Sequence, residues 1–249
     1  MKRILAFVIC SILLLGLCAC KTAETPTQTN AATQPETTVP AKSYAGLTAT
    51  FVGDSITNGA KLNNGESRYW QLLQKDLGLG EVTGMGVNGS CYSTLSEFGM
   101  DHEPLVTRYQ NIPDTDLIFI FMGTNDFGRA TPLGSVEDRE DVSFQGAMNK
   151  VLDEVKKAHP ESKIILLTPI IRFDKNVNGL GYTLDDYIAA IKEVAEKQEV
   201  LVIDNNALTK DSLPEGVFAD TVHPDKFGHQ ILAGAIKTWL EENIDAVLN

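Results

Sequence analysis

Cysteine and positive charge are both scarce in this sequence. Four cysteines occur among 249 residues, and Cys91 is the only one that follows the first 20 residues. A single thiol excludes an intramolecular disulfide from the rest of the chain, whose fold must therefore be stable without one. The 21 Lys and Arg residues are outnumbered by 33 Asp and Glu residues, which gives a net charge of −12. This excess of acid argues against a protein that binds nucleic acid by neutralising phosphates.

The chain also lacks an apolar run long enough for a transmembrane anchor. Its N-terminal run, Ile4–Ala19, holds 16 uncharged residues behind two basic ones, whereas a spanning helix needs about 20. This pattern predicts an export signal over residues 1–19. Leu17-Cys18-Ala19-Cys20 resembles the bacterial lipobox, which implies lipidation of Cys20, and an ordinary signal peptide cleaved nearby is the alternative. We expect an exported protein at the cell surface or in the periplasm, held to the membrane by this lipid alone.

Residues 20–43 are predicted to form a disordered tether. After Cys20 they contain seven threonines and three prolines, but no Leu, Ile, Met or aromatic residue. Such a segment cannot bury enough apolar surface to offset the loss of chain entropy on folding. It would act as a flexible spacer between the lipid and residues 44–249.

Residues 44–249 alternate short apolar runs with amphipathic stretches, which predicts an α/β fold. The expected strands are Ala49–Gly53, Glu81–Gly86, Leu117–Met122, Lys163–Thr168 and Val200–Ile203. The expected helices are Ser67–Gly78, Glu103–Gln110, Ser143–His159, Thr183–Gln198 and Asp225–Asn243. Two of the strands are almost entirely apolar, as in a parallel sheet covered on both faces. We therefore expect a three-layer α/β/α sandwich with right-handed crossovers.

Ligands of open parallel sheets bind at the carboxyl ends of the strands, so the loops that follow the strands are the candidates for chemistry. The loop after the first strand reads Gly53-Asp54-Ser55-Ile56-Thr57-Asn58-Gly59. It has neither the Gly-Lys-Ser/Thr of a phosphate loop nor the Gly-x-Gly-x-x-Gly of a dinucleotide site. Ser55 is placed either to act as a nucleophile or to cap the start of a helix.

Three further loops carry polar groups. Gly89 follows the second strand and can turn its backbone N–H toward a ligand, because glycine adopts positive φ angles easily. After the third strand, Asn125 can donate an amide hydrogen bond or form an Asx turn, and Asp126 can brace that turn. Near the C-terminus, Asp220 precedes His223 by three residues, so its carboxylate can bond Nδ1 and leave Nε2 free as a base.

Taken together, these loops resemble the SGNH (GDSL) hydrolase family. The matching segments are Gly53-Asp54-Ser55, Gly89, Gly123-Thr124-Asn125-Asp126 and Asp220-Thr221-Val222-His223-Pro224. Ser90 and Thr221 depart from the family pattern, which more often has Asp and Gly there, but neither change removes a catalytic group. The resemblance implies a flavodoxin-like, five-stranded parallel sheet of order 2-1-3-4-5. It also implies a carboxylic ester hydrolase that uses no cofactor and no metal.

The same resemblance assigns roles to individual residues. Ser55 would attack an ester carbonyl, His223 would take its proton, and Asp220 would orient the imidazole. The backbone N–H groups of Ser55 and Gly89 and the side-chain amide of Asn125 would form the oxyanion hole. The implied strand order places the first three loops side by side, and the 15 residues 205–219 can extend far enough to return the last loop to Ser55.

Three long loops, 92–102, 127–141 and 172–182, leave the same edge of the sheet and are typical of segments that set specificity. In them, the residues that could line a substrate pocket are Phe127, Arg129, Phe173 and Tyr182. A metal shared by His223 and His229 is conceivable, but a structural histidine on a helix face is the favoured interpretation of His229. Cys91 is interpreted as a packed thiol rather than a nucleophile.

The sequence therefore predicts an exported, lipid-anchored serine esterase whose partner is an ester substrate. Deacetylation of a glycan is favoured, because no long apolar run resembles a lipid-binding lid. A lysophospholipase- or thioesterase-like acylhydrolase is the alternative within this class. Two other classes stay open: a metal-dependent phosphoesterase, for which the early loops supply few ligands, and a non-catalytic glycan-binding lipoprotein, which would not need Ser55, Asp220 and His223 together.

Overall fold

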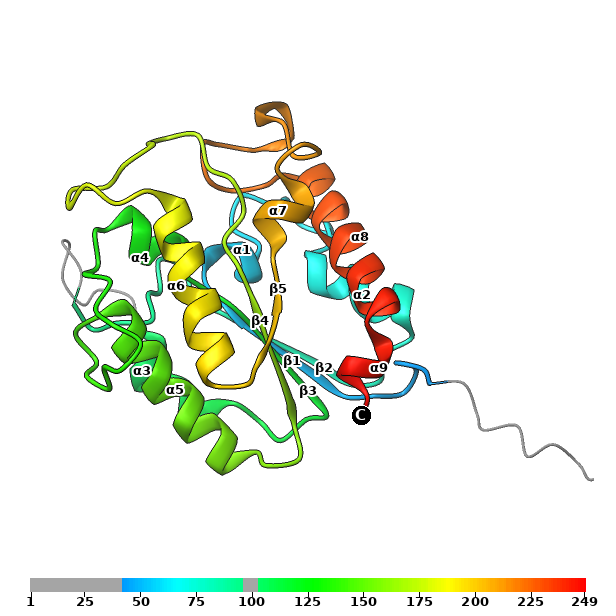
Figure 1. The fold of residues 1–249 in the computed structure, drawn as a ribbon. Helices are drawn as coiled ribbons and strands as arrows, with labels where there is room; N and C mark the ends of the chain where they lie inside the picture. The colour runs from blue at the N-terminus through cyan, green and yellow to red at the C-terminus, as the bar shows by residue number, and fades with distance from the viewer. Residues whose placement is uncertain (1–41, 96–102) are drawn as a thin grey trace, which may run out of the picture. The chain divides into compact units, whose positions relative to one another are not determined.

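The computed structural model describes residues 42–95 and 103–249. Their centre is a five-stranded sheet of order β2-β1-β3-β4-β5, in which all neighbouring strands are parallel (Figure 1). This is the strand order that the family resemblance implies, and that prediction is confirmed. The strands are β1 (Ala49–Gly53), β2 (Val82–Gly86), β3 (Leu117–Phe121), β4 (Lys163–Leu167) and β5 (Leu201–Ile203).

Helices cover both faces of the sheet, which confirms the three-layer sandwich (Figure 1). One face packs against α3 (Leu105–Arg108), α5 (Phe144–Ala158) and α6 (Leu184–Lys197). The other packs against α1 (Ser55–Asn58), α2 (Tyr69–Leu77), α8 (Lys226–Glu242) and α9 (Ile244–Val247). The remaining elements lie in the connections: α4 (Thr124–Gly128), α7 (Asn205–Thr209) and the 3-10 helices Tyr109–Asn111 and Glu215–Val217.

Alternate side chains of each strand enter two separate hydrophobic cores. On β3, Ile118 and Ile120 pack beneath α5 and α6, whereas Leu117, Phe119 and Phe121 pack on the side of α2 and α8. All five residues of this strand are buried. Burial on both faces removes the need for polar alternation, which explains the uninterrupted apolar runs in the sequence.

The predicted helices are present, but the segment Glu103–Gln110 differs from expectation. It forms only the four-residue α3, followed at once by the 3-10 helix Tyr109–Asn111. The short helices α1, α4, α7 and α9 were not predicted, because four or five residues are too few to show a helical period. Two of them, α1 and α4, begin two and three residues after a strand end and carry candidate site residues.

The predictions for the N-terminus fall outside the described residues. These are the signal segment 1–19, the lipidation site Cys20 and the tether as far as residue 41; residues 96–102 of one predicted specificity loop also lie outside. Within the ranges 42–95 and 103–249, no helix combines the length and the apolar character that crossing a membrane requires.

The end of β2 lies so close to α1 that Gly86 has no space for a side chain. A Cβ at this position would lie 2.1 Å from the backbone nitrogen of Asn58 and 2.6 Å from its Cα. Backbone atoms cannot rotate away as a flexible side chain can. Glycine at this position therefore lets the helix that begins with Ser55 pack against the neighbouring strand.

We expect Gly86→Ala to lower the free energy of unfolding by about 1–3 kcal/mol, because the added methyl group must displace backbone. Urea denaturation monitored by circular dichroism measures the change. The matched control is Gly234→Ala in α8, where nothing lies within 4 Å of an added Cβ. That variant should be neutral or stabilised by up to about 1 kcal/mol. Parent-like stability of Gly86→Ala would contradict the close approach.

Candidate active site

The first turn of α1 presents Ser55 at the carboxyl end of β1. Asp54 caps this helix, since its Oδ1 accepts a 2.9 Å hydrogen bond from the N–H of Ile56. Ser55 is the first helical residue and its side chain does not act as the cap. The helix-cap interpretation of Ser55 is therefore wrong, because the neighbouring carboxylate already fills that role. The Ser55 hydroxyl bonds a different partner.

That partner is His223, which is 168 residues away in sequence. Its Nε2 lies 2.8 Å from Ser55 Oγ, and its Nδ1 lies 2.8 Å from Oδ2 and 3.0 Å from Oδ1 of Asp220. When Nδ1–H donates to the carboxylate, Nε2 is the lone-pair atom that accepts the Ser55 proton. The structure thus brings the three predicted residues into one continuous hydrogen-bonded row.

Asp220 and His223 are held in a turn that is closed by an antiparallel bridge between Phe218 and Pro224. Within the turn, Asp220 Oδ1 accepts hydrogen bonds from the N–H groups of Val222, at 2.9 Å, and His223, at 2.8 Å. Partial burial opposes ionisation of Asp220, but these donors and the imidazole outweigh it and lower the pKa of the carboxyl group. The carboxylate is consequently charged at neutral pH and available to the His223 ring.

The predicted oxyanion-hole residues come from the loops that flank Ser55. Gly89 has a φ of 73°, and neither its N–H nor that of Ser55 donates to another group within the part of the chain described. Asn125 is the second residue of α4, and its Nδ2 donates to Ser90 O at 3.1 Å and to Asp54 Oδ2 at 3.3 Å. Its amide therefore links the loops that follow β1 and β2.

Arg108 is a buried cation behind these loops that sequence analysis missed. It is 5% exposed, and its guanidinium donates to Gly53 O at 2.9 Å, Ser90 Oγ at 3.2 Å and Met85 O at 3.3 Å. Burial lowers the pKa of Arg108 to about 10, so it keeps its charge at neutral pH. These bonds fix the loop that carries Gly89. One feature of the sequence could have indicated this role: Arg108 shares the buried face of a short helix with Leu105.

Asp126 is a buried acid on the other side of the same loop. Its carboxyl oxygens accept hydrogen bonds from the N–H of Tyr92, at 3.0 and 3.1 Å, and from that of Ser93 at 3.4 Å. Burial raises the pKa of Asp126 to about 7 in spite of these donors. The sequence allowed Asp126 to brace its own turn; in the structure its side chain also joins α4 to the loop after β2.

The four residues predicted to line a substrate pocket lie in unlike surroundings. Phe127 is fully buried and packs edge-on against Tyr187, with ring centroids 5.8 Å apart. The prediction for Phe127 is wrong, because its apolar ring is part of the core between α4 and α6. Arg129 and Phe173 are half-buried and Tyr182 is exposed, so their contact with substrate stays a prediction.

His229 and Cys91 both lie in the protein interior, as expected. His229, on α8, is fully buried, and its Nδ1 accepts a 3.1 Å hydrogen bond from the N–H of Tyr69, on which its ring stacks. Cys91 is 5% exposed, and burial raises the pKa of its thiol, which opposes formation of a thiolate nucleophile. His229 is thus a structural histidine held by this bond and by stacking, and Cys91 is a packed thiol.

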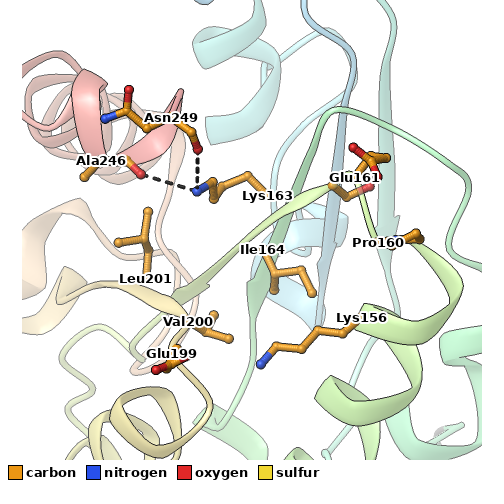
Figure 2. Close-up of a pocket in the computed structure, with 11 residues that line it drawn as sticks. Lys156, Pro160, Glu161, Lys163, Ile164, Glu199, Val200, Leu201, Ala246 and Asn249 are labelled. Carbon is orange, nitrogen blue, oxygen red and sulfur yellow. Dashed lines mark hydrogen bonds between the residues drawn. The ribbon is translucent and has the colours of Figure 1, made fainter.

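A cavity of about 370 Å³ lies at the opposite, amino end of the sheet (Figure 2). It is bordered by the first residues of β4 and β5 and by the C-terminus. There Lys163 Nζ donates to Asn249 O at 3.2 Å and to Ala246 O at 3.5 Å. Because Ser55 lies at the carboxyl end of β1, this cavity is separate from the candidate site.

Replacement of Asp126 by Asn should change how stability depends on pH. Aspartate in an unfolded chain has a pKa of about 3.9, whereas burial raises that of Asp126 to about 7 in the fold. The folded protein holds this proton more tightly, so the resulting stability is complete below about pH 4 and is lost as the pH rises through about 7. The free energy of unfolding should therefore fall less from pH 4 to pH 7 in Asp126→Asn than in the parent.

Urea denaturation across this pH range measures the two slopes. The control is Asp211→Asn, at an exposed position, which should keep the slope of the parent. Identical slopes for Asp126→Asn and the parent would show that burial does not hold the proton.

Comparison with known proteins agrees with this geometry. Residues 51–231 match the GDSL-like Lipase/Acylhydrolase family. An acetylxylan esterase from Geobacillus stearothermophilus is 26% identical over 207 residues, which cover 74% of this chain and 90% of that protein. The crystal structure of a Lactobacillus plantarum protein superposes with a TM-score of 0.70 at 26% identity, over 80% of this chain and 98% of the other.

A second solved structure, that of Axe2, an acetylxylan esterase from Geobacillus stearothermophilus, gives a TM-score of 0.56 at 26% identity. The match covers 81% of this chain and 95% of Axe2. The matched family segment begins in β1 and ends in α8, so it includes every loop that contributes to the Ser55 site. The chain therefore belongs to the GDSL-like lipase/acylhydrolase family and is a carboxylic ester hydrolase.

Proposed function

We propose that this protein removes acetyl groups from a glycan, with Ser55 as nucleophile, His223 as general base and Asp220 as its partner. The observation that carries the mechanism is the row of short contacts from Ser55 Oγ to His223 Nε2, 2.8 Å, and from His223 Nδ1 to Asp220 Oδ2, 2.8 Å. The acetyl-glycan substrate draws its support from the 26% identity to an acetylxylan esterase.

In the first half-reaction, Ser55 Oγ bonds the acetyl carbon while its proton passes to His223 Nε2 and the carbonyl electron pair moves to oxygen. The charged Asp220 stabilises the imidazolium that forms. When the tetrahedral intermediate collapses, the C–O bond to the sugar breaks and the alkoxide takes the proton from Nε2. The products of this step are a free sugar hydroxyl and acetyl-Ser55.

In the second half-reaction, water attacks the acetyl carbon and gives its proton to His223 Nε2. Collapse of the second tetrahedral intermediate breaks the bond to Ser55 Oγ, which recovers that proton, and acetic acid is released. Both intermediates carry negative charge on the former carbonyl oxygen. The N–H groups of Ser55 and Gly89 are the backbone donors for that charge.

Asn125 would be the third donor to the oxyanion. Its amide hydrogen bond to Asp54 Oδ2, at 3.3 Å, is longer than that to Ser90 O, at 3.1 Å. We infer that the Asp54 bond is the one that is shared with the oxyanion, because it is the weaker of the two. The bond to Ser90 would meanwhile keep the amide facing the nucleophile.

A second candidate function is hydrolysis of esters with a longer acyl chain. Three apolar side chains of the 172–182 loop are exposed, namely Val177 at 54%, Leu180 at 52% and Tyr182 at 38%. Their exposure favours an apolar ligand on this loop. A panel of acetylated xylo-oligosaccharides, 4-nitrophenyl acetate and 4-nitrophenyl decanoate separates the two candidates, since the first predicts preference for acetyl esters.

We expect Ser55→Ala and His223→Ala each to lower kcat on 4-nitrophenyl acetate by at least about 10³-fold, because each removes a member of one catalytic unit. A fluorophosphonate probe should label Ser55 in the parent and not in Ser55→Ala, as mass spectrometry of the peptide will show. The control is Ser212→Ala, an exposed serine, which should keep parental kcat. Full activity of Ser55→Ala with an unchanged circular dichroism spectrum would refute the mechanism.

We further propose that the protein is exported and anchored by lipid on Cys20. The support is the charged start, the apolar run and the segment Leu17-Cys18-Ala19-Cys20. In cells that express the full chain, Cys20→Ala should abolish incorporation of labelled palmitate, because no acceptor thiol remains at the cleavage point. Cys91→Ala is the matched control and should keep the label. Equal labelling of Cys20→Ala and the parent would exclude this anchor.

A further inference from the structure

The segment that follows β4 contacts both the helix that carries Asn125 and the turn that carries His223. Residues 172–175 lie between α4, which carries Asn125, and the turn that carries Asp220 and His223. Neither the Ser-His-Asp row nor the oxyanion donors include any residue of this segment. Its hydrogen bonds to α4 and to the turn are nevertheless short, at 2.6 to 2.9 Å.

On one side, the Arg172 side chain holds α4. Its Nη1 donates to Thr124 O at 2.6 Å, and its guanidinium lies 5.2 Å from the centre of the Phe127 ring. A Cβ at Gly128 would lie 2.7 Å from Nη1, so the helix approaches the guanidinium closely because glycine stands there. Lys175 Nζ adds a 2.9 Å bond to Gly128 O. Together these contacts hold both ends of α4, the helix of Asn125.

The orientation of Arg172 is itself fixed by Asp174. Nε and Nη2 each donate to one carboxylate oxygen of Asp174 at 2.6 Å. Only 8% of the Arg172 side chain is exposed. A bidentate, charge-assisted pair of this kind sets the plane of the guanidinium as well as its position. The Nη1 group, which Asp174 does not use, is thereby placed to donate to the carbonyl of Thr124.

On the other side, the next residue holds the turn of the catalytic histidine. The N–H of Phe173 donates to Thr221 O at 2.8 Å, and Thr221 lies between Asp220 and His223. The Phe173 ring packs edge-on against Phe218, at the base of that turn, with centroids 5.1 Å apart. Two adjacent residues, Arg172 and Phe173, thus make the contact to α4 and the contact to this turn.

We propose that Arg172 is a positioning residue that fixes Asn125 relative to the Asp220–His223 turn, a role that rests on the proposed mechanism through Ser55 and His223. It does not touch the reacting atoms. It acts by fixing the distance between the oxyanion donor on one loop and the general base on another. A displacement of about 1 Å in such a pair can cost about 10²-fold in rate.

The test is a double-mutant cycle between Arg172→Ala and Asn125→Ala, with kcat and KM measured on 4-nitrophenyl acetate. Arg172→Ala alone should lower kcat about 10- to 100-fold, the scale of a misplaced catalytic group, and change KM by less than about threefold, because an oxyanion donor acts mainly in the transition state. In the Asn125→Ala background its effect should shrink to less than about threefold, because the residue that it positions is then absent. An equal loss in both backgrounds would overturn the proposal, as would parental kcat in Arg172→Ala.

Two milder variants keep the test valid if Arg172→Ala does not fold. Asp174→Asn keeps Arg172 but weakens the bidentate pair and should lower kcat in the same direction by a smaller factor. Arg172→Lys keeps the charge but not the fork geometry, and should recover only part of the activity. The control is Arg139→Ala, whose guanidinium also bonds a carboxylate, Asp153, and backbone carbonyls but contacts neither α4 nor the turn in the structure described. It should keep parental kcat.

A readout that does not need turnover separates this proposal from the proposed function. In ¹⁵N–¹H spectra, the side-chain amide signals of Asn125, assigned by their loss in Asn125→Ala, should shift or broaden in Arg172→Ala and not in Arg139→Ala. If the parent hydrolyses no ester, the proposed function fails, and the Asn125 signals alone decide whether Arg172 positions that side chain. Unchanged Asn125 signals in Arg172→Ala would overturn the positioning role whatever the activity.

Discussion

The in-register pairing of β1 with β2 and β3 is the constraint on which the site depends. Gly53 lies opposite both Gly86 and Phe121, so three strands end at one level and the loops that follow them start side by side. A slip of one residue would turn every side chain of a strand to the other face of the sheet. Two hydrophobic cores oppose that slip, because all residues of β1 and β3 are buried.

The loops at this edge owe their precision to buried polar bonds. Arg108 and Asp126 each bond the loop after β2, one through Ser90 Oγ and the other through the N–H groups of Tyr92 and Ser93. A buried group that loses its partner costs about 1–3 kcal/mol, and more when it is charged. Alternative loop conformations are therefore unfavourable. The donors that would meet a developing oxyanion are held in place before the substrate arrives, which is the condition for electrostatic catalysis.

Part of the site was predictable because Ser55, Gly89 and Asn125 follow closely on strand ends. An apolar run in the sequence predicts a buried strand such as β3, and the polar residues that follow such a strand lie at the ligand-binding edge of the sheet. Neighbouring contacts were not predictable in this way. Phe127 lies two residues after Asn125, yet it turns into the core, and Asp126 bonds the backbone of a different loop. Both outcomes depend on which surfaces meet when the layers pack.

The sequence by itself determined the strands and the longer helices, because apolar periodicity is a property of the chain, and its resemblance to the SGNH family selected Ser55, Asp220 and His223 as a set. Only the tertiary structure decided that Asp54 rather than Ser55 caps α1 and that Arg108 and Arg172 bond backbone carbonyls of distant loops. A buried guanidinium takes whichever carbonyl groups the packed layers leave without a partner. No local pattern encodes that choice, because its partners lie tens of residues away and meet only when the sheet and its helices have assembled.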